Sequence, residues 1–323
     1  MNSSTLRPTM RLSLKKSEMS FYAGFDLGGS ELKYGLINEK GKIVFKGKAS
    51  SPATIDGLLE IIGSVWESMK SQEKKKIRAV GFGFAGFYSL KEKKILQSPN
   101  YPSLDNFDLQ PALSQIIDVP FRIDNDANMA AFGEWKAGAG QDVNSLVLLT
   151  IGTGIGSGII LEGKLWHGVC GFAGEIGHIT VNPIGERCKC GNYGCLETEA
   201  AAPKIVKNYN ALRKTSENIS AREVFLRAKK GDKAARQSFS QAGYFLGIGL
   251  SVAISLLNPE KIILGGGVMT TGDYLLPAAI AEAEKRSVRA AFKCCSIEKA
   301  WLGNDAGFIG ASFWAKESIN KLD

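Results

Sequence analysis

Long segments that are both uncharged and apolar are scarce in the sequence. Its longest such segment runs from Ala242 to Leu257, which is shorter than the roughly 20 residues that a spanning helix requires. We therefore expect a buried core helix there and no membrane partner. The residues before Phe21 also lack the apolar stretch of a secretory signal. We expect a disordered tail over residues 1–20 and a cytoplasmic location.

The composition excludes disulfide-scaffold, low-complexity and disordered proteins. With 44% apolar and 22% charged residues, the chain is close to the average soluble globular protein and can build a large core. Its six cysteines do not form a disulfide framework pattern, because three of them are crowded at Cys188, Cys190 and Cys195. This crowding indicates a metal site or a reduced interior.

The net charge is positive, because 40 Lys and Arg residues stand against 32 Asp and Glu residues, a balance of +8. A basic balance can indicate a nucleic-acid partner when the charges form a patch interleaved with aromatic residues. The two basic runs, at 74–78 and 91–94, contain no aromatic residue. We interpret both as solvated faces and expect no nucleic-acid partner.

Apolar periodicity predicts an α/β protein with two similar halves, each opened by a strand, a glycine turn and a second strand. The expected strands are 21–26, 33–38, 42–48, 77–83, 121–123, 145–151, 261–264 and one near 296. The expected helices are 55–69, 109–117, 126–137, a helical region that ends at about 257, and two more at 274–286 and 305–316. A loop-rich insertion is expected at 163–197.

Glycine is abundant, at 37 residues, and it clusters at the two strand-to-strand turns. The first cluster is in residues 26–30 (Asp-Leu-Gly-Gly-Ser) and the second in residues 151–158. Neither matches a P-loop and neither opens a helix as the dinucleotide fingerprint requires, so a P-loop and a Rossmann site are both disfavoured. One such turn alone is an ordinary hairpin, but two favour backbone cradles for phosphate. Asp26 would then stand beside a magnesium ion.

An acidic cluster at residues 124–128 (Asp-Asn-Asp-Ala-Asn) follows a short strand and opens a helix. Asn and Asp are common helix caps, which is one interpretation of the cluster. A carboxylate at this place, Asp126, can also accept the proton of a substrate hydroxyl during phosphoryl transfer. Both interpretations stay open on the sequence alone.

The crowded cysteines lie ten to seventeen residues after His178, in the order Cys188, Cys190 and Cys195. One imidazole and three thiolates form a closed tetrahedral set, which is typical of structural zinc. The alternative is a group of buried or redox-active thiols. Cys170, Cys294 and Cys295 carry no pattern, and His167 is interpreted as an ordinary surface or satisfied core histidine.

Taken together, these segments resemble the ROK family of sugar kinases and regulators, within the actin-like ATPase superfamily. The most specific match is residues 174–178 (Gly-Glu-Ile-Gly-His) followed by residues 188–197 (Cys-x-Cys-Gly-x-x-Gly-Cys-x-Glu). The resemblance implies two actin-like (ribonuclease H-like) α/β domains with a cleft between them. The small domain would take 21–123 plus about 305–323, and the large domain 124–304 with a zinc-binding loop at 163–197.

The resemblance also implies roles for individual residues. Asp126 matches the base that deprotonates the primary hydroxyl of the sugar. The residues that match sugar contacts are Asn100, Asn125, Glu175, His178 and Glu197. The residues that match the ATP and Mg²⁺ site are Asp26, Gly28, Gly29, Ser30, Lys33, Thr153, Gly154, Gly265, Gly266 and Gly267. The implied zinc ligands are His178, Cys188, Cys190 and Cys195.

The function implied by the resemblance is ATP-dependent phosphorylation of the 6-hydroxyl of a hexose, with glucose as the first choice. N-acetylmannosamine, N-acetylglucosamine and fructose are the alternatives. A sugar-responsive regulator is disfavoured, because the residues before Phe21 are too few for a helix-turn-helix domain. A homodimer, and closure of the two domains around the sugar, are expected from the resemblance alone.

Overall fold

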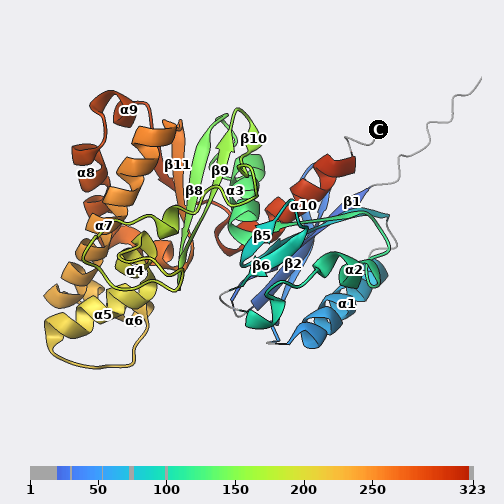
Figure 1. The fold of residues 1–323 in the computed structure, drawn as a ribbon, viewed down its shortest axis with the longest axis horizontal. Coiled ribbons are helices and arrows are strands. Elements are labelled where there is room, and N and C mark those ends of the chain that lie inside the picture. The colour runs from blue at the N-terminus through green and yellow to red at the C-terminus, as the bar shows by residue number, and fades with distance from the viewer. Residues whose placement is uncertain (1–19, 30, 53, 73–75, 99–100, 320–323) are drawn as a thin grey trace, which may run out of the picture.

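In the computed structural model, residues 20–319 are described except for 30, 53, 73–75 and 99–100. The chain forms two five-stranded mixed sheets, one in each half of the molecule (Figure 1). The α/β fold with two similarly opened halves is therefore confirmed. Whether these halves are domains with a boundary at residue 123 stays a prediction.

The first sheet has the strand order β3-β2-β1-β4-β7. Its three opening strands pair antiparallel, and β4 and β7 then add parallel to β1. The strands are β1 (Phe21–Leu27), β2 (Glu31–Asn38), β3 (Ile43–Ser50), β4 (Ile77–Phe84) and β7 (Phe121–Asn125). A small separate hairpin, β5 (Phe87–Ser89) with β6 (Lys94–Gln97), lies beside this sheet.

Helix α1 (Ile55–Gln72) forms because its apolar residues recur at helical spacing. The residues of that stripe that are buried in the core of the first half are Leu58, Ile62, Val65, Trp66 and Met69. The predicted helix at 109–117 is shorter than expected. After Asp108 caps its first turn, α2 (Leu109–Ser114) ends at Ser114, and the residues up to Ile117 form a turn.

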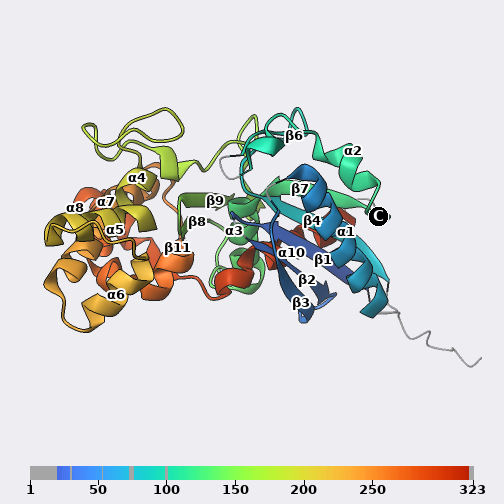
Figure 2. The same ribbon diagram turned by 90° about the horizontal axis from the view of Figure 1, so that it is seen from below.

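The second sheet has the order β10-β9-β8-β11-β12. Its strands are β8 (Leu146–Ile151), β9 (Ile155–Leu161), β10 (Lys164–Leu165), β11 (Lys261–Gly265) and β12 (Ser296–Lys299). The helices of this half are α4 (Leu196–Ala200), α5 (Ala202–Arg213), α6 (Ala221–Lys229), α7 (Lys233–Leu257), α8 (Leu276–Arg286) and α9 (Arg289–Lys293). The insertion at 163–197 is mostly irregular, as expected, and runs along one edge of the molecule (Figure 2).

Helix α7 is long and apolar enough to cross a membrane by length and composition. That is weak evidence, because the core helix of a soluble protein passes the same test. Half of its apolar window is buried, and it packs against α5 and α8 through residues such as Leu246, Leu250 and Ile254. The core helix predicted at 242–257 is confirmed.

The parallel strands bring the chemistry-bearing segments to one edge of each sheet. In the first sheet Asp26 is in register with Gly83, and Gly83 is in register with Asp124. In the second sheet Thr150 is in register with Gly265. Ligands of open α/β sheets bind outside the carboxyl ends of the strands. Both glycine turns and the acidic cluster therefore lie where a ligand would be expected.

Two helices cross between the sheets, α3 (Asp126–Ala137) and α10 (Ala306–Ile319). α3 packs against β8 and β9, and α10 packs against β1 and β4 (Figures 1 and 2). At their crossing an added Cβ at Gly310 would overlap the carbonyl oxygen of Met129, and one at Gly133 would overlap that of Ala306. The two backbones are in direct contact because glycine leaves room for them.

We expect Gly310→Ala to lower the free energy of unfolding by about 1 to 3 kcal/mol, because the methyl group must push apart two packed backbones. The matched control is Gly63→Ala in α1, where the nearest atom to an added Cβ is Ile116 Cγ2 at 3.5 Å, an ordinary contact. That control should gain about 0.5 to 1 kcal/mol. Urea denaturation of both variants measures the difference, and an unchanged Gly310→Ala protein would contradict the crossing.

Candidate active site

The first glycine turn joins β1 to β2 and is closed by a hydrogen bond from Gly28 N to Glu31 O, 3.1 Å long. The hydroxyl of Tyr101 donates to Gly28 O at 2.7 Å. Gly28 is half-buried, whereas Gly29 is exposed, so backbone at the tip is free to approach a ligand. Two predicted site residues, Ser30 and Asn100, lie outside the described residues.

Asp26 lies at the end of β1 and its carboxylate is buried against α10, where an added Cβ at Gly307 would overlap it. Lys33 is its Cα partner on β2. Burial, with the negative charge of Asp126 as the next cause, raises the pKa of Asp26 to about 7. The charge of Lys33 acts in the opposite direction. A cation at this carboxylate would therefore relieve a real electrostatic cost.

The acidic cluster turned out to contain both a helix cap and a free carboxylate. The side chain of Asn125 is the N-cap of α3, accepting from Ala127 N at 2.8 Å and from Asn128 N at 3.1 Å. Its amide nitrogen donates to Gly86 O at 3.0 Å. Asn125 therefore uses its side chain for local structure, and its predicted contact with a sugar is untested.

Asp126 is the first residue of α3, and one carboxylate oxygen accepts from Ala127 N at 2.9 Å. Burial raises the pKa of Asp126 to about 6, while backbone hydrogen bonds and Lys33 act to lower it. A carboxylate with this pKa is ionised at neutral pH and is a better proton acceptor than an ordinary aspartate. It has the properties of a general base.

The second glycine turn, between β8 and β9, is closed by a hydrogen bond from Gly152 N to Gly154 O at 2.9 Å. Thr153 at its tip is exposed, and nothing lies within 4 Å of an added Cβ at Gly152. Glu197 contacts this turn, because its Oε2 accepts from Ile155 N at 2.9 Å. Glu197, a predicted sugar contact, therefore also supports the turn that is predicted to bind phosphate.

The glycine run at the end of β11 lies against the same turn. Gly266 has φ +86°, and an added Cβ would come within 2.5 Å of Ile151 O. Only glycine permits both that backbone conformation and that approach. Gly265 ends the strand, and Gly267 has open space beside it and begins the next turn of helix. Residues 265–267 therefore extend the ligand-facing edge of the second sheet.

The described residues include one cluster with the donor set for a zinc ion: His178, Cys188, Cys190 and Cys195. Their ligand atoms lie within 4.8 Å of one another. Cys188 Sγ is 3.6 Å from His178 Nδ1, and Cys190 Sγ is 3.6 Å from Cys195 Sγ. All six cysteines are free thiols. One imidazole and three sulfurs in this space fit tetrahedral zinc.

Glu175 immediately precedes the short helical turn Ile176–His178 and is half-buried. Burial raises the pKa of Glu175 to about 7, and the charges of Asp126 and Glu197 raise it further. These causes place three carboxylates, from separate segments, within electrostatic reach of one another. The predicted sugar-side residues Glu175, His178 and Glu197 are brought together with the predicted base.

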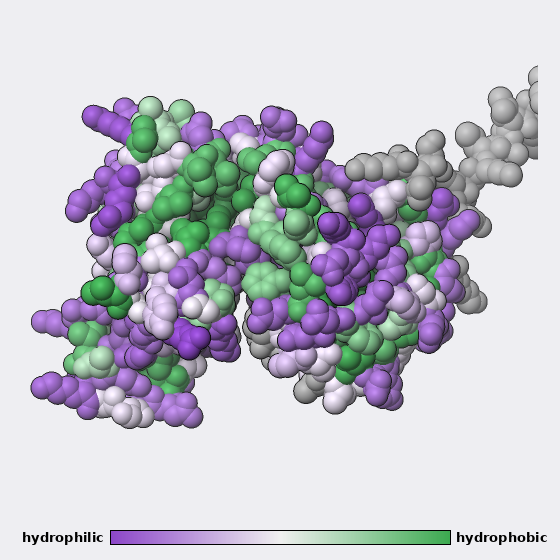
Figure 3. Space-filling model, in the orientation of Figure 1, coloured by the Kyte–Doolittle hydropathy of each residue, from purple (hydrophilic) through white to green (hydrophobic). Residues whose placement is uncertain are grey.

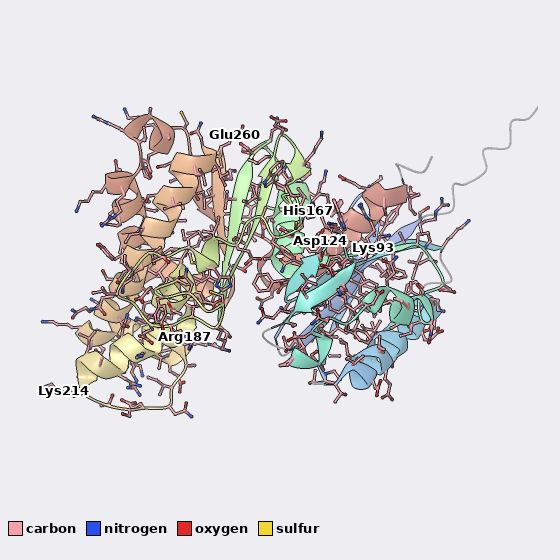
Figure 4. The ribbon with its side chains drawn as sticks, in the orientation of Figure 1. Lys93, Asp124, His167, Arg187, Lys214 and Glu260 are labelled. Carbon is pink, nitrogen blue, oxygen red and sulfur yellow. The ribbon has the colours of Figure 1, made fainter. Side chains whose placement is uncertain are left out.

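The structure also contains a pair that the sequence interpretation did not use. His167 Nε2 lies 2.7 Å from Asp124 Oδ2, and both side chains are largely buried (Figure 4). His167 is indeed a satisfied histidine, as expected, but its partner is the residue two before the predicted base. The only signals in the sequence were that His167 is one of two histidines and that Asp124 is in the acidic cluster.

Comparison with known proteins gives a family. The ROK family model matches residues 22–318. A glucokinase of Halalkalibacterium halodurans is 34% identical, over 94% of this chain and 97% of the relative. A xylose repressor of Caldicellulosiruptor bescii is 31% identical, over 89% of this chain and 76% of the repressor. The relatives therefore include both kinases and regulators.

Among solved structures, the ROK family glucokinase from Streptomyces griseus in complex with glucose and AMPPNP superimposes with a TM-score of 0.81. It is 30% identical, and the match covers 92% of this chain and 99% of that one. With the family model matched along nearly the whole chain, the protein belongs to the ROK family.

The raised pKa of Asp126 predicts a stability effect of definite sign. Its ordinary value is 3.8 and its folded value about 6, so the folded state binds the proton more tightly. The ionised group therefore costs stability as the pH rises through that interval and above it. We expect Asp126→Asn to raise the free energy of unfolding at pH 8 by about 1 to 2 kcal/mol without magnesium or nucleotide.

The matched control is Asp142→Asn, because Lys261 lowers the pKa of Asp142. Neutralising Asp142 should give no gain in stability at pH 8. Thermal unfolding of both variants at pH 8 and pH 4 checks the signs, and the gain from Asp126→Asn should shrink at the lower pH. A loss of stability for Asp126→Asn at pH 8 would contradict the electrostatic account.

Proposed function

We propose that the protein is an ATP-dependent sugar kinase that phosphorylates the 6-hydroxyl of a hexose, with glucose as the first choice. One observation carries the proposal. Asp126, with a pKa of about 6, lies at the ligand-facing edge where other acidic groups and two glycine turns gather. Phosphoryl transfer requires mainly such positioning and charge neutralisation.

The sugar would be held by hydroxyl contacts to Glu175, His178 and Glu197, with Asn125 beside them. Carboxylates and amides accept and donate the hydrogen bonds that hydroxyls offer. The aromatic rings of Phe87 and His178, whose centroids are 6.2 Å apart, supply a wall at this place. Asn100 is retained as a further proposed contact.

Asp126 would take the proton of the sugar hydroxyl as the hydroxyl oxygen attacks the terminal phosphorus of ATP. The bond from that phosphorus to the bridging oxygen would break, and ADP would leave with that oxygen. The proton moves to the free carboxylate oxygen, since the other one is held by Ala127 N. General base assistance of this kind contributes typically about 10²- to 10⁴-fold. Helix α3 holds the carboxylate of Asp126 in one position, which lowers the entropic cost of reaching the reactive geometry.

The phosphates would be received at the two glycine turns by backbone N–H groups of Gly29, Thr153 and Gly154, with the hydroxyl of Ser30 and the ammonium of Lys33 in support. Gly28 would shape the first turn, because its own N–H donates to Glu31 O. The adenosine would lie along residues 265–267. When bound, Mg²⁺ supplies positive charge to the phosphate oxygens. Asp26 offers a carboxylate oxygen, the donor that this ion prefers. Lys33 lies within electrostatic range of both Asp26 and Asp126.

His178, Cys188, Cys190 and Cys195 would hold a structural zinc ion, which supplies a fixed crosslink within the loop and leaves no open position for catalysis. The chain around it is already tied locally, since Cys188 N donates to Asn192 O at 2.7 Å and Leu196 N donates to Ile179 O at 2.9 Å. These ties orient Glu197 relative to His178. The site thus acts on the sugar through the loop.

The choice of glucose is supported by the relatives. Several curated relatives named glucokinase, from different bacteria, are 30 to 34% identical to this chain, and the Streptomyces griseus structure was obtained with glucose. N-acetylmannosamine, N-acetylglucosamine and fructose are the alternative acceptors, and a solved relative named as an N-acetylmannosamine kinase is 26% identical.

We expect Asp126→Asn to reduce sugar-dependent ADP formation by about 10²-fold or more, because the base is removed while its shape is kept. ADP release with ATP and Mg²⁺ is measured against a panel of hexoses and N-acetylhexosamines. Asp273→Asn, which alters an exposed pair with Lys299, is the control and should match the unaltered protein. A folded, zinc-loaded protein that turns over no sugar would overturn the proposal.

Removal of zinc should raise the KM for the sugar strongly, because the loop carries Glu175, His178 and Glu197. The KM for ATP should rise less, because the loop reaches the second glycine turn only through the bond from Ile155 N to Glu197 Oε2. A chelator treatment followed by metal analysis and kinetics measures this, and re-addition of Zn²⁺ should restore the KM. Cys190→Ser is expected to bind zinc more weakly than Cys294→Ser, a matched change at an exposed cysteine outside the cluster. Full activity with zinc demonstrably absent would contradict the loop's role.

A further inference from the structure

His167 and Asp124 form a buried pair at the place where the two halves of the molecule join. Asp124 ends the buried part of β7, and its side chain is 3% exposed, against 15% for His167. The two residues come from separate segments and meet at the middle of the molecule, where the two halves join (Figure 4). Figure 3 shows a notch between the halves in the same orientation.

The Asp124 carboxylate organises the start of α3. Its Oδ1 accepts from Asn125 N at 2.8 Å and from Asn128 Nδ2 at 2.9 Å. These contacts flank Asp126 on both sides in the sequence. The orientation of the carboxylate therefore sets the backbone from which the proposed base projects. His167 occupies the remaining oxygen, Oδ2.

His167 also closes the loop that leads to the proposed sugar residues. Its carbonyl oxygen accepts from Ala173 N at 3.1 Å, which ties the two ends of the 167–173 loop together. Glu175 follows two residues later, and the loop is held again where the Ser157 hydroxyl binds Gly174 O. One residue thus contacts the base-bearing segment through its side chain and the sugar-bearing loop through its backbone.

The imidazole of His167 also contacts α10. The ring centroids of His167 and Trp314 are 5.8 Å apart, and the guanidinium of Arg122 lies 4.1 Å from the centroid of Trp314. This packing limits the rotation of the imidazole, so that Nε2 stays directed at Asp124. An aromatic wall and a buried acceptor together define one orientation for the side chain.

We propose that His167 is a positioning residue that, through Asp124, aligns the sugar-holding loop with the base at the start of α3. The inference rests on the kinase function proposed above. Loss of the imidazole would leave Asp124 Oδ2 buried without its donor and would free the loop from the β7–α3 junction. A buried, unpaired carboxylate is strongly unfavourable, so the junction would rearrange.

The test compares His167→Leu with His167→Gln, which keeps a side-chain N–H for Asp124. His167→Leu should raise the KM for the sugar at least about 10-fold, and up to about 100-fold, with the KM for ATP within about twofold. His167→Gln should recover most of the loss. Equal rises in both KM values, or the same loss in both variants, would overturn the inference.

A double-mutant cycle with Asp124→Asn isolates the pair. In the unaltered protein, Asp124→Asn should raise the KM for the sugar. In the His167→Leu background the same substitution should leave this KM unchanged or lower it, because it removes the unpaired charge. Losses that multiply independently would contradict the coupling. Sugar binding without ATP, followed by tryptophan fluorescence, gives the same comparison without turnover.

Lys261→Met is the control for general destabilisation. The substitution removes the buried ammonium of Lys261, which donates to Ala139 O and to Asp142 Oδ1. Lys261 lies at the start of β11, away from the carboxyl edge of the sheet. The unfolding temperature of this variant should fall while both KM values stay unchanged. If the unaltered protein phosphorylates no sugar, the proposed function fails. If the unaltered protein phosphorylates a sugar but the His167 variants do not raise the KM for the sugar more than the KM for ATP, only the positioning role of His167 fails.

Discussion

The close crossing of α3 and α10 is the constraint on which the rest of the structure depends. Each helix lies against a different sheet, and their backbones meet through Gly133 and Gly310. The same two helices carry the groups that matter at the site. Asp126 begins α3, and Gly307 near the start of α10 makes room for the carboxylate of Asp26. A wider crossing would separate the two carboxylates and open the junction between the halves.

This closeness has an electrostatic cost. The charge of Asp126 raises the pKa of both Asp26 and Glu175, each already raised by burial. Without bound cations such a group of carboxylates is a source of instability. The proposed chemistry requires the same arrangement, since Asp26 would face the cation bound to ATP and Asp126 would accept a proton from the sugar hydroxyl. The unpaired carboxylates that the proposed reaction needs therefore lower the stability of the unliganded protein, as is common for active sites.

The sequence predicts local structure well and distant contacts poorly. Helix α1 follows from periodicity, because it buries one apolar face. Helix α3, by contrast, is buried at every residue from Ala127 to Glu134, and β1 is buried along its whole length, so their sequences are apolar without a one-sided pattern. α2 is shorter than predicted: the helix ends at Ser114, and the apolar pattern continues to Ile117 through a closing turn in which Ile117 N donates to Leu113 O at 2.8 Å. The contacts of Glu197 with Ile155 and of His167 with Asp124 join segments 42 and 43 residues apart. No local pattern specifies such pairs, because they depend on how segments far apart in the sequence are brought together.

Glu197 shows how the loop and the glycine turns become one unit. Its Oε2 binds the backbone of the second glycine turn, and its Oε1 lies 4.0 Å from Cys188 Sγ in the cysteine cluster. It is also the second residue of α4, two residues after Cys195, the N-cap of that helix. A displacement of the cysteine cluster would therefore move both a proposed sugar contact and a proposed phosphate cradle. His167 makes the corresponding connection on the other side, between the same loop and the start of α3. The loop is thus tied both to the second glycine turn and to the start of α3, so that in the proposed reaction its order would be needed to align hydroxyl, base and phosphate.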